Sequence, residues 1–135
     1  VGVLSAGALS DRSGPVWPTV ASFAVRLGIF GMIAAAKEPA AIAVFALAYG
    51  LTYWVTAPLT VIFVRDLFGP RHLGLISGLV TMTHHIAGGL GALTGAVLFD
   101  VEGDYQSAFL LMAALSVAGA GFTFAIGRRR QASAP

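Results

Sequence analysis

Four long apolar runs dominate the pattern of hydrophobic and polar positions along the chain. The runs cover residues 17–36, 40–64, 73–99 and 108–127, and short polar or charged clusters separate them. Each run approaches or exceeds the ~20 apolar residues with which a helix crosses the ~30 Å hydrocarbon layer of a bilayer. The pattern therefore predicts an all-α membrane protein with four transmembrane helices.

The polar clusters set the predicted boundaries. The apolar stretch at the start looks like a helix end, and neither Met nor a signal-peptide pattern precedes it, so we expect a fragment of a longer protein. The predicted segments are 1–10, the end of a transmembrane helix; 11–15, a cytoplasmic loop; 16–36 and 40–64, transmembrane helices; 65–72, a cytoplasmic loop; 73–99, a transmembrane helix; 100–107, an external loop; 108–127, a transmembrane helix; and 128–135, a cytoplasmic tail.

The composition agrees with this interpretation. Only 10% of the 135 residues are charged, whereas a soluble domain carries about 25%. Cysteine is absent, so disulfides and thiolate metal sites are excluded. The three histidines include a loop residue and do not form the ligand cluster of a metal enzyme, so we expect no metal, no cofactor and no enzymatic activity. The net charge of +2 lies at loop ends, which indicates topology and not nucleic-acid binding.

Basic residues divide unequally between the two sets of alternating loops. One set holds six of them, namely Arg12, Arg65, Arg71, Arg128, Arg129 and Arg130. The other set holds Lys37 alone, beside the acidic residues Glu38, Asp100, Glu102 and Asp104. Because Lys and Arg accumulate in short cytoplasmic loops, the division predicts that loop 11–15 and the C-terminus lie inside the cell.

The run 73–99 contains no charged residue, yet two adjacent histidines, His84 and His85, occupy its middle. Helical spacing of three and four collects small and polar residues on one stripe, namely Ser77, Thr81, His84, Gly88, Gly91 and Gly95. The three glycines would let another helix approach closely. We expect His84 to face a packed or water-lined interior with His85 beside it. The alternative is a histidine that bonds between helices to hold the packing.

The run 40–64 carries a polar and aromatic flank, formed by Tyr49, Thr52, Tyr53, Thr56 and Thr60, and Pro58 removes a backbone donor. Such a kinked polar helix is typical of the border of a substrate cavity. The alternative is that the threonines bond to their own helix and the tyrosines lie at the membrane interface.

Arg26 lies close to the middle of the first run. An arginine at the bilayer centre costs at least ~2.5 kcal/mol, so a functional role is expected, such as pairing with an anion or a carboxylate. The alternatives are that it extends toward the cytoplasm, or that it pairs with a helix absent from this chain.

The sequence "GALSDRSG" (residues 7–14) resembles the G-x-L-x-D-R-x-G signature of the major facilitator superfamily. The matching positions include Gly7, Asp11, Arg12 and Gly14. The resemblance implies a conformational latch that breaks when the helix bundle rocks. Asp11 would accept bonds at a helix N-terminus or pair with a basic group, and the glycines would permit a tight turn. Pro15 and Val16 replace the basic residues that usually follow, which weakens this charge network.

Residues 65–109 resemble the monocarboxylate and oxalate/formate branch of that superfamily. They contain an FG-x-R-x-x-G-x-I-x-G start, a glycine-rich helix and an FD-x-x-G-x-Y end. The resemblance implies the C-terminal part of a twelve-helix fold, from the end of helix 8 through helices 9 to 12. It implies a secondary transporter of a small organic anion, acting by proton symport or anion exchange in the plasma membrane. Its partners would be the solute, the lipid bilayer and a missing N-terminal half.

Within this resemblance, His84 and His85 are the expected binders of the substrate carboxylate or carriers of the coupling proton. The rest of the expected substrate or proton pathway is Arg26, Tyr49, Tyr53, Thr56 and Thr81. Two alternatives stay open: a drug/proton efflux antiporter of the same fold, and an inactive, truncated membrane protein.

Overall fold

The chain is helical from its first described residues to its last. The computed structural model describes the backbone of residues 2–132 and the side chains of residues 2–128. The elements are α1 (Gly2–Ser13), α2 (Val16–Ala35), α3 (Pro39–Tyr53), α4 (Thr56–Phe68), the 3₁₀ turn η1 (Pro70–His72), α5 (Leu73–Glu102) and α6 (Gln106–Ala132). This confirms the predicted all-α fold class.

Among residues 2–132, four helical segments are long and apolar enough to cross a membrane. They are Val16–Ala35, Pro39–Phe68, Pro70–Glu102 and Gln106–Arg128, and they fall on the four apolar runs. A helix of 20 residues is about 30 Å long, which matches the hydrocarbon layer. The chain is therefore a multi-pass membrane protein.

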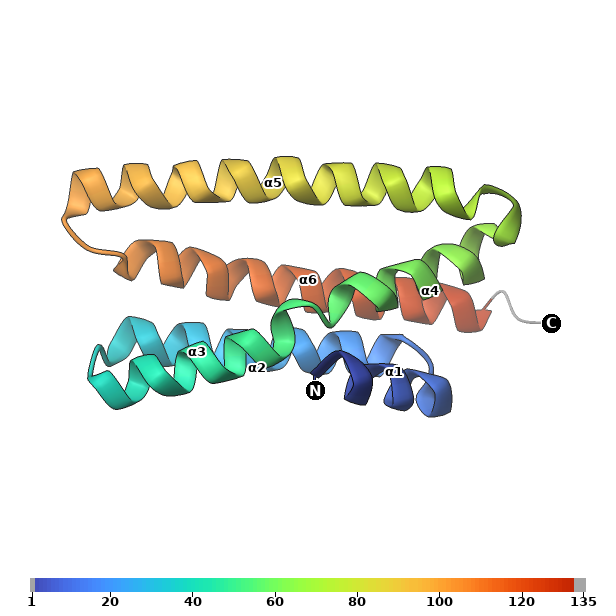
Figure 1. The fold of residues 1–135 in the computed structure, drawn as a ribbon, viewed down its shortest axis with the longest axis horizontal. Helices are drawn as coiled ribbons and strands as arrows, with labels where there is room; N and C mark the ends of the chain where they lie inside the picture. The colour runs from blue at the N-terminus through green and yellow to red at the C-terminus, as the bar shows by residue number, and fades with distance from the viewer. Residues whose placement is uncertain (1, 133–135) are drawn as a thin grey trace.

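The connections gather at two opposite ends of the bundle (Figure 1). The α1–α2 turn, the η1 turn and the end of α6 lie at one end, and the α2–α3 and α5–α6 connections lie at the other. The arginine-rich loops are therefore separated by the full length of the helices from the loops that hold Lys37 and the acidic residues.

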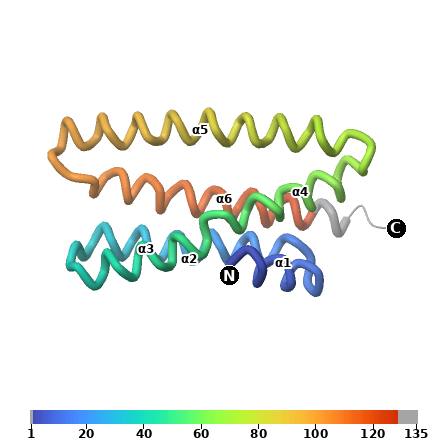
Figure 2. The backbone as a smooth tube through the Cα atoms, viewed as in Figure 1, coloured from blue at the N-terminus to red at the C-terminus, as the bar shows by residue number. Residues whose placement is uncertain are grey.

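The second span, expected as one helix over residues 40–64 with a kink at Pro58, is divided into two helices. α3 ends at Tyr53 and α4 begins at Thr56, and the backbone steps sideways between them (Figure 2). Pro58 has no N–H for the Trp54 carbonyl four residues earlier. The Ala57 N–H donates to that carbonyl instead, at 3.3 Å. The span is thus broken one turn before the proline.

The loops are shorter than the sequence pattern predicts, because the helices run on. α1 continues through Ser13, three residues beyond its expected end, and Gly14 closes it with a left-handed φ of 75°. Gly103 closes α5 in the same way with a φ of 79°. Glycine adopts this conformation without the steric cost that other residues meet. The predicted tail 128–135 is helical through Ala132, and the rest of it lies outside the described residues.

α2 and α6 form the tightest helix pair. Their approach depends on glycine: a Cβ at Gly127 would come within 2.9 Å of both methyl groups of Val16. The glycine stripe within residues 88–95 predicted close packing in α5, whereas the sequence contained no comparable signal for the contact between Gly127 and Val16. α5 is held much more loosely, against α4 and α6, and none of its residues is buried.

We predict that Gly127→Leu destabilises the protein by about 1–3 kcal/mol, because the added side chain overpacks the contact with Val16. The measurement is the thermal unfolding midpoint of the detergent-solubilised complete protein. Gly121→Leu is the matched control, since a Cβ at Gly121 meets nothing within 4 Å. Equal midpoints for the two variants would contradict the proposed role of Gly127.

Candidate functional site

A cavity of about 740 Å³ lies between the first turn of α4 and the middle of α5. Its lining includes five of the seven residues of the expected pathway, namely Tyr53, Thr56, Thr81, His84 and His85. Arg26 and Tyr49 are not part of the lining. Two spans that are consecutive in sequence therefore bring most of the expected site together.

The two histidine rings stand nearly perpendicular, with centroids 5.8 Å apart and an interplanar angle of 84°. Nδ1 of His85 lies 2.8 Å from the backbone carbonyl of Thr81, one turn earlier. A carbonyl only accepts, so this bond places the proton of neutral His85 on Nδ1 and leaves Nε2 as an acceptor. His84 forms no hydrogen bond with any residue of the described chain.

Other cavity residues supply hydroxyl groups and an apolar wall. Ser77 Oγ is buried, and residues 2–132 give it no hydrogen-bond partner. Trp54 and Pro58 contribute apolar surface from the interrupted span. Helical periodicity placed Ser77 on the same stripe of residues as His84. Pro58 indicated a break in the helix of the second span. The sequence therefore contained signals for both groups of cavity residues.

The threonines of the second span agree partly with the interpretation as a cavity border and partly with the alternative, in which they bond to their own helix. Thr52 Oγ1 donates to the carbonyls of Ala48 and Tyr49, both at 3.1 Å, and Thr60 Oγ1 donates to the Thr56 carbonyl at 2.7 Å. These two side chains therefore bond to their own helices, as the structural alternative predicts. Thr56 and Thr60 also border the cavity.

Tyr49 lies in a cluster of aromatic rings between the cavity and the end of the bundle that holds the α2–α3 connection. Its ring stacks on Phe45, with a centroid distance of 5.6 Å, and meets Phe30 edge-on at 5.8 Å. It also contacts Tyr53 at 5.5 Å. Tyr49 is thus linked to the cavity through the ring of Tyr53.

Arg26 bonds to the backbone of the interrupted span. Its Nη2 donates to the carbonyl of Thr52 at 2.6 Å and to the carbonyl of Tyr53 at 3.2 Å. Its guanidinium carbon lies 5.6 Å from the centroid of the Phe23 ring. This arrangement differs from the expected pairing with an anion or carboxylate, and also from extension toward the cytoplasm.

The family model of the Major Facilitator Superfamily matches residues 1–135. The chain belongs to the major facilitator superfamily. This membership confirms the predicted assignment to transmembrane transporters and not to enzymes.

Two relatives of this superfamily chain are proteins named Monocarboxylate transporter 13. The one from Rattus norvegicus is 32% identical over 128 residues, and the one from Bos taurus is 31% identical over 123 residues. Each alignment covers 90% of this chain and 29% of the relative, so the chain spans less than a third of their length. The relatives confirm the resemblance to the monocarboxylate branch. No solved structure gives a significant match.

The superfamily motif lies at the α1–α2 turn and not wholly in a loop. Asp11 and Arg12 belong to the last turn of α1. Asp11 and Gly14 border a cavity of about 280 Å³ with Arg65 and Asp66. Asp11 thus faces the end of α4, near a basic side chain, while Gly7 lies further back on α1 with open space around it.

The glycine stripe of α5 is mostly uncovered. A Cβ at Gly88 or Gly95 would meet nothing within 4 Å, and at Gly91 it would touch only the Met112 side chain, at 3.7 Å. Close packing at these glycines therefore stays a prediction about helices other than those described. Across residues 2–132 no three His, Asp or Glu side chains form a group that could hold a metal ion.

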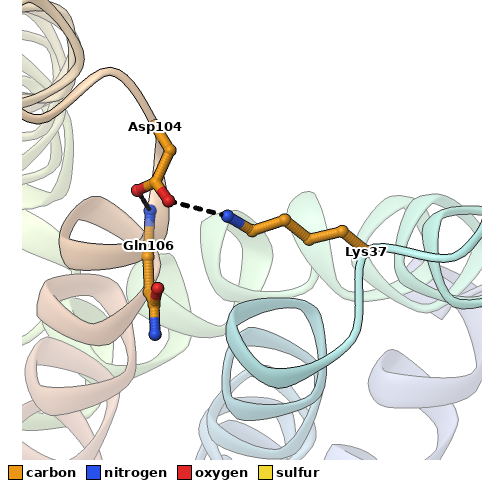
Figure 3. A network of polar contacts seen from close by, with 3 residues as sticks. All are labelled: Lys37, Asp104 and Gln106. Atoms are coloured by element: carbon orange, nitrogen blue, oxygen red, sulfur yellow. Dashed lines mark hydrogen bonds and ion pairs between the residues drawn. The ribbon is translucent and has the colours of Figure 1, made fainter.

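An ion pair joins the α2–α3 and α5–α6 connections, which lie at the same end of the bundle (Figure 3). Lys37 Nζ lies 3.0 Å from Asp104 Oδ2, and Asp104 Oδ1 accepts the Gln106 N–H at 2.8 Å, at the start of α6. The bond from the Gln106 backbone, followed by the bond from Lys37, lowers the pKa of Asp104 below 3.8. The sequence offered one signal for this pair, a single lysine among acidic loop residues.

Asp104→Asn should lower the thermal midpoint at pH 7 by at most a few degrees, because asparagine keeps the capping oxygen and loses the charge. Because the pKa of Asp104 is lower in the folded protein than in the unfolded one, its carboxylate stabilises the fold above pH 3.8. This stabilisation is lost as the pH falls through the folded-state pKa. The difference from wild type should therefore shrink below about pH 3.8. Asp100→Asn, at an exposed site on α5, is the control; a pH-independent difference at Asp104 would contradict the ion pair.

Proposed function

We propose that this chain forms part of a secondary transporter that moves a small organic anion, a monocarboxylate or dicarboxylate, by alternating access. The observation that carries the proposal is the cavity of about 740 Å³ that His84, His85 and five hydroxyl-bearing residues line at mid-span. The similarity to relatives named Monocarboxylate transporter 13 supports the choice of substrate class.

The bond between His85 and Thr81 favours proton symport over anion exchange. Neutral His85 uses its only N–H on the Thr81 carbonyl, so its Nε2 offers a lone pair, which a carboxylate does not bind. Protonation turns Nε2 into a donor and adds a positive charge, and charge-assisted hydrogen bonds are about twice as strong as neutral ones. Anion binding would therefore require a proton to bind as well.

His84, with no hydrogen-bond partner in the described chain, can turn either ring nitrogen to the substrate. Thr81, Thr56 and Tyr53 would add neutral hydrogen bonds. Trp54 and Pro58 would contact the organic part of the anion. Tyr49 and Arg26 would act on the pathway through Tyr53, since neither lines the cavity.

A second half of the carrier would complete the site. Both histidines are exposed on α5, and titratable side chains at membrane depth face protein or a water-filled cavity, not lipid. Alternating access needs two halves that rock about a central site. We infer that an N-terminal half, for which the length of the relatives leaves room, covers α5 and packs on Gly88, Gly91 and Gly95.

The motif at the α1–α2 turn would serve as the cytoplasmic latch. Asp11 and Arg65 border the same small cavity. Arg65 pairs with Asp66, with 3.1 Å between Nη2 and Oδ1, so holding α1 against α4 would require Arg65 to exchange this partner for Asp11. Arg12 and the glycines Gly7 and Gly14 would complete the latch. The protein would lie in the plasma membrane with its C-terminus in the cytoplasm, in line with the distribution of basic residues.

Drug/proton efflux is the second candidate. The width of the cavity and the apolar surface of Trp54, Val61 and Val80 would suit a larger, hydrophobic solute. Uptake of labelled lactate, oxalate and formate by the complete carrier, compared with export of cationic dyes, separates the two functions. Transport of neither class would favour an inactive membrane protein.

We predict that uptake of the labelled anion rises as the external pH falls, because the anion would bind together with a proton. His85→Ala should flatten this pH profile, and His84→Ala should lower uptake at least tenfold, an effect of about 1.4 kcal/mol or more. His72→Ala, in the exposed η1 turn, is the matched control. A variant at His84 or His85 with an unchanged rate and pH profile would remove these side chains from the proposal.

Topology can be tested separately, because this chain contains no cysteine. In a complete carrier freed of other cysteines, Glu38→Cys should react with a membrane-impermeant maleimide in intact cells. Arg71→Cys should react only after permeabilisation. The opposite labelling pattern would invert the proposed orientation.

A further inference from the structure

We propose that Arg26 is a positioning residue: it clamps the interruption between α3 and α4 and so sets the wall of the cavity opposite the histidines. The role of that wall in transport rests on the proposed function. The clamp itself rests on hydrogen bonds within the chain.

The carbonyls that Arg26 binds are those that the interruption deprives of regular partners. In an unbroken helix the Thr52, Tyr53 and Trp54 carbonyls would accept from residues 56, 57 and 58. Here the Val55 N–H donates to Thr52 and the Ala57 N–H to Trp54, both at 3.3 Å, three residues apart instead of four. No backbone N–H across the break reaches the Tyr53 carbonyl within residues 2–132.

Arg26 donates a hydrogen bond to the Tyr53 carbonyl, which no backbone N–H across the break reaches. One nitrogen, Nη2, bridges the last two carbonyls of α3 at 2.6 and 3.2 Å. Carbonyls left without donors at membrane depth are costly, and they also form the negative end of the α3 dipole, where a cation is favourable. In the described chain no carboxylate forms an ion pair with Arg26, so these carbonyls are its main counterpart.

The clamp acts directly on the cavity wall. Tyr53, whose carbonyl Arg26 holds, lines the cavity, and the Tyr53 ring meets the Trp54 ring edge-on at 5.5 Å. The first turn of α4 continues the wall with Thr56, Ala57 and Pro58. Arg26 itself does not reach the cavity lining, so it would affect a solute only through this wall.

Pro58 gives a direct test, because Pro58→Ala restores an N–H at position 58. The Trp54 carbonyl could then accept from position 58, which frees the Ala57 N–H for the Tyr53 carbonyl. The backbone would thereby satisfy the group that Arg26 now serves. Loss of Arg26 should consequently matter less when Pro58 is replaced, which an arginine that binds the solute directly would not show.

The experiment is a double-mutant cycle in the complete carrier, with wild type, Arg26→Gln, Pro58→Ala and the double variant. The first readout is the thermal midpoint in detergent. Arg26→Gln should lower it clearly, and should lower it by less than half as much in the Pro58→Ala background. Pro70→Ala, in the exposed η1 turn, replaces Pro58→Ala in the control cycle and should give no such rescue.

The second readout is the kinetics of anion uptake. Arg26→Gln should raise KM at least tenfold with a smaller change in kcat, and the double variant should have a KM within about threefold of Pro58→Ala alone. Arg26→Lys should be milder than Arg26→Gln, since a single ammonium group can still bridge two carbonyls.

The outcomes separate the clamp from the proposed function. Equal losses from Arg26→Gln in both backgrounds, in midpoint and in KM, would overturn the clamp. Coupling of the midpoints without transport of any carboxylate would support the clamp and reject the proposed substrate. If Arg26→Gln does not accumulate in the membrane, recovery of folded protein by Pro58→Ala supports the clamp, and failure to recover it counts against the clamp.

Discussion

Every backbone polar group that lies in hydrocarbon must find its hydrogen bond within the protein, and this requirement explains the central part of the structure. The second span breaks at Trp54 because Pro58 withholds a donor, and the break leaves the Tyr53 carbonyl without a backbone partner. A charged side chain from the neighbouring span, Arg26, donates to it. The interruption and the partly buried Arg26 therefore belong together, because the arginine donates to a carbonyl of the break and the carbonyl gives the arginine a partner within the membrane.

The same break shapes the cavity. A straight helix presents one continuous face, whereas the step between α3 and α4 brings Tyr53, Trp54 and the first turn of α4 to the cavity together. α5 faces them with its histidines and needs no irregularity of its own. Its 30 residues form one helix, closed by Gly103 at its C-terminal end. An irregular wall and a regular wall thus border a cavity at mid-span that is lined by imidazole rings, hydroxyl groups and apolar surface.

The sequence predicted the spans well, because length and hydropathy are the properties that a bilayer selects. It also placed Tyr53, Thr56, Thr81, His84 and His85 in one region, since helical spacing and two adjacent runs suffice for that. The partner of Arg26 could not be predicted, because 26 residues separate it from Thr52 and only the packing of α2 on α3 joins them. The end of α1 was predicted three residues before Ser13, because polar residues in the last turn of a helix resemble those of a loop.

The helices of the bundle differ in how closely they pack on one another. α2 and α6 meet so closely that a methyl group at Gly127 would overlap Val16, whereas α5 buries none of its residues within this chain. Close packing within the described chain is thus concentrated in one pair of helices, and the residues of the proposed site lie on another. Under the proposed function, substitutions along the cavity side of α5 would change what is recognised without disturbing the packing of α2 on α6. Such a division would let related carriers differ in cargo on the same α2–α6 scaffold.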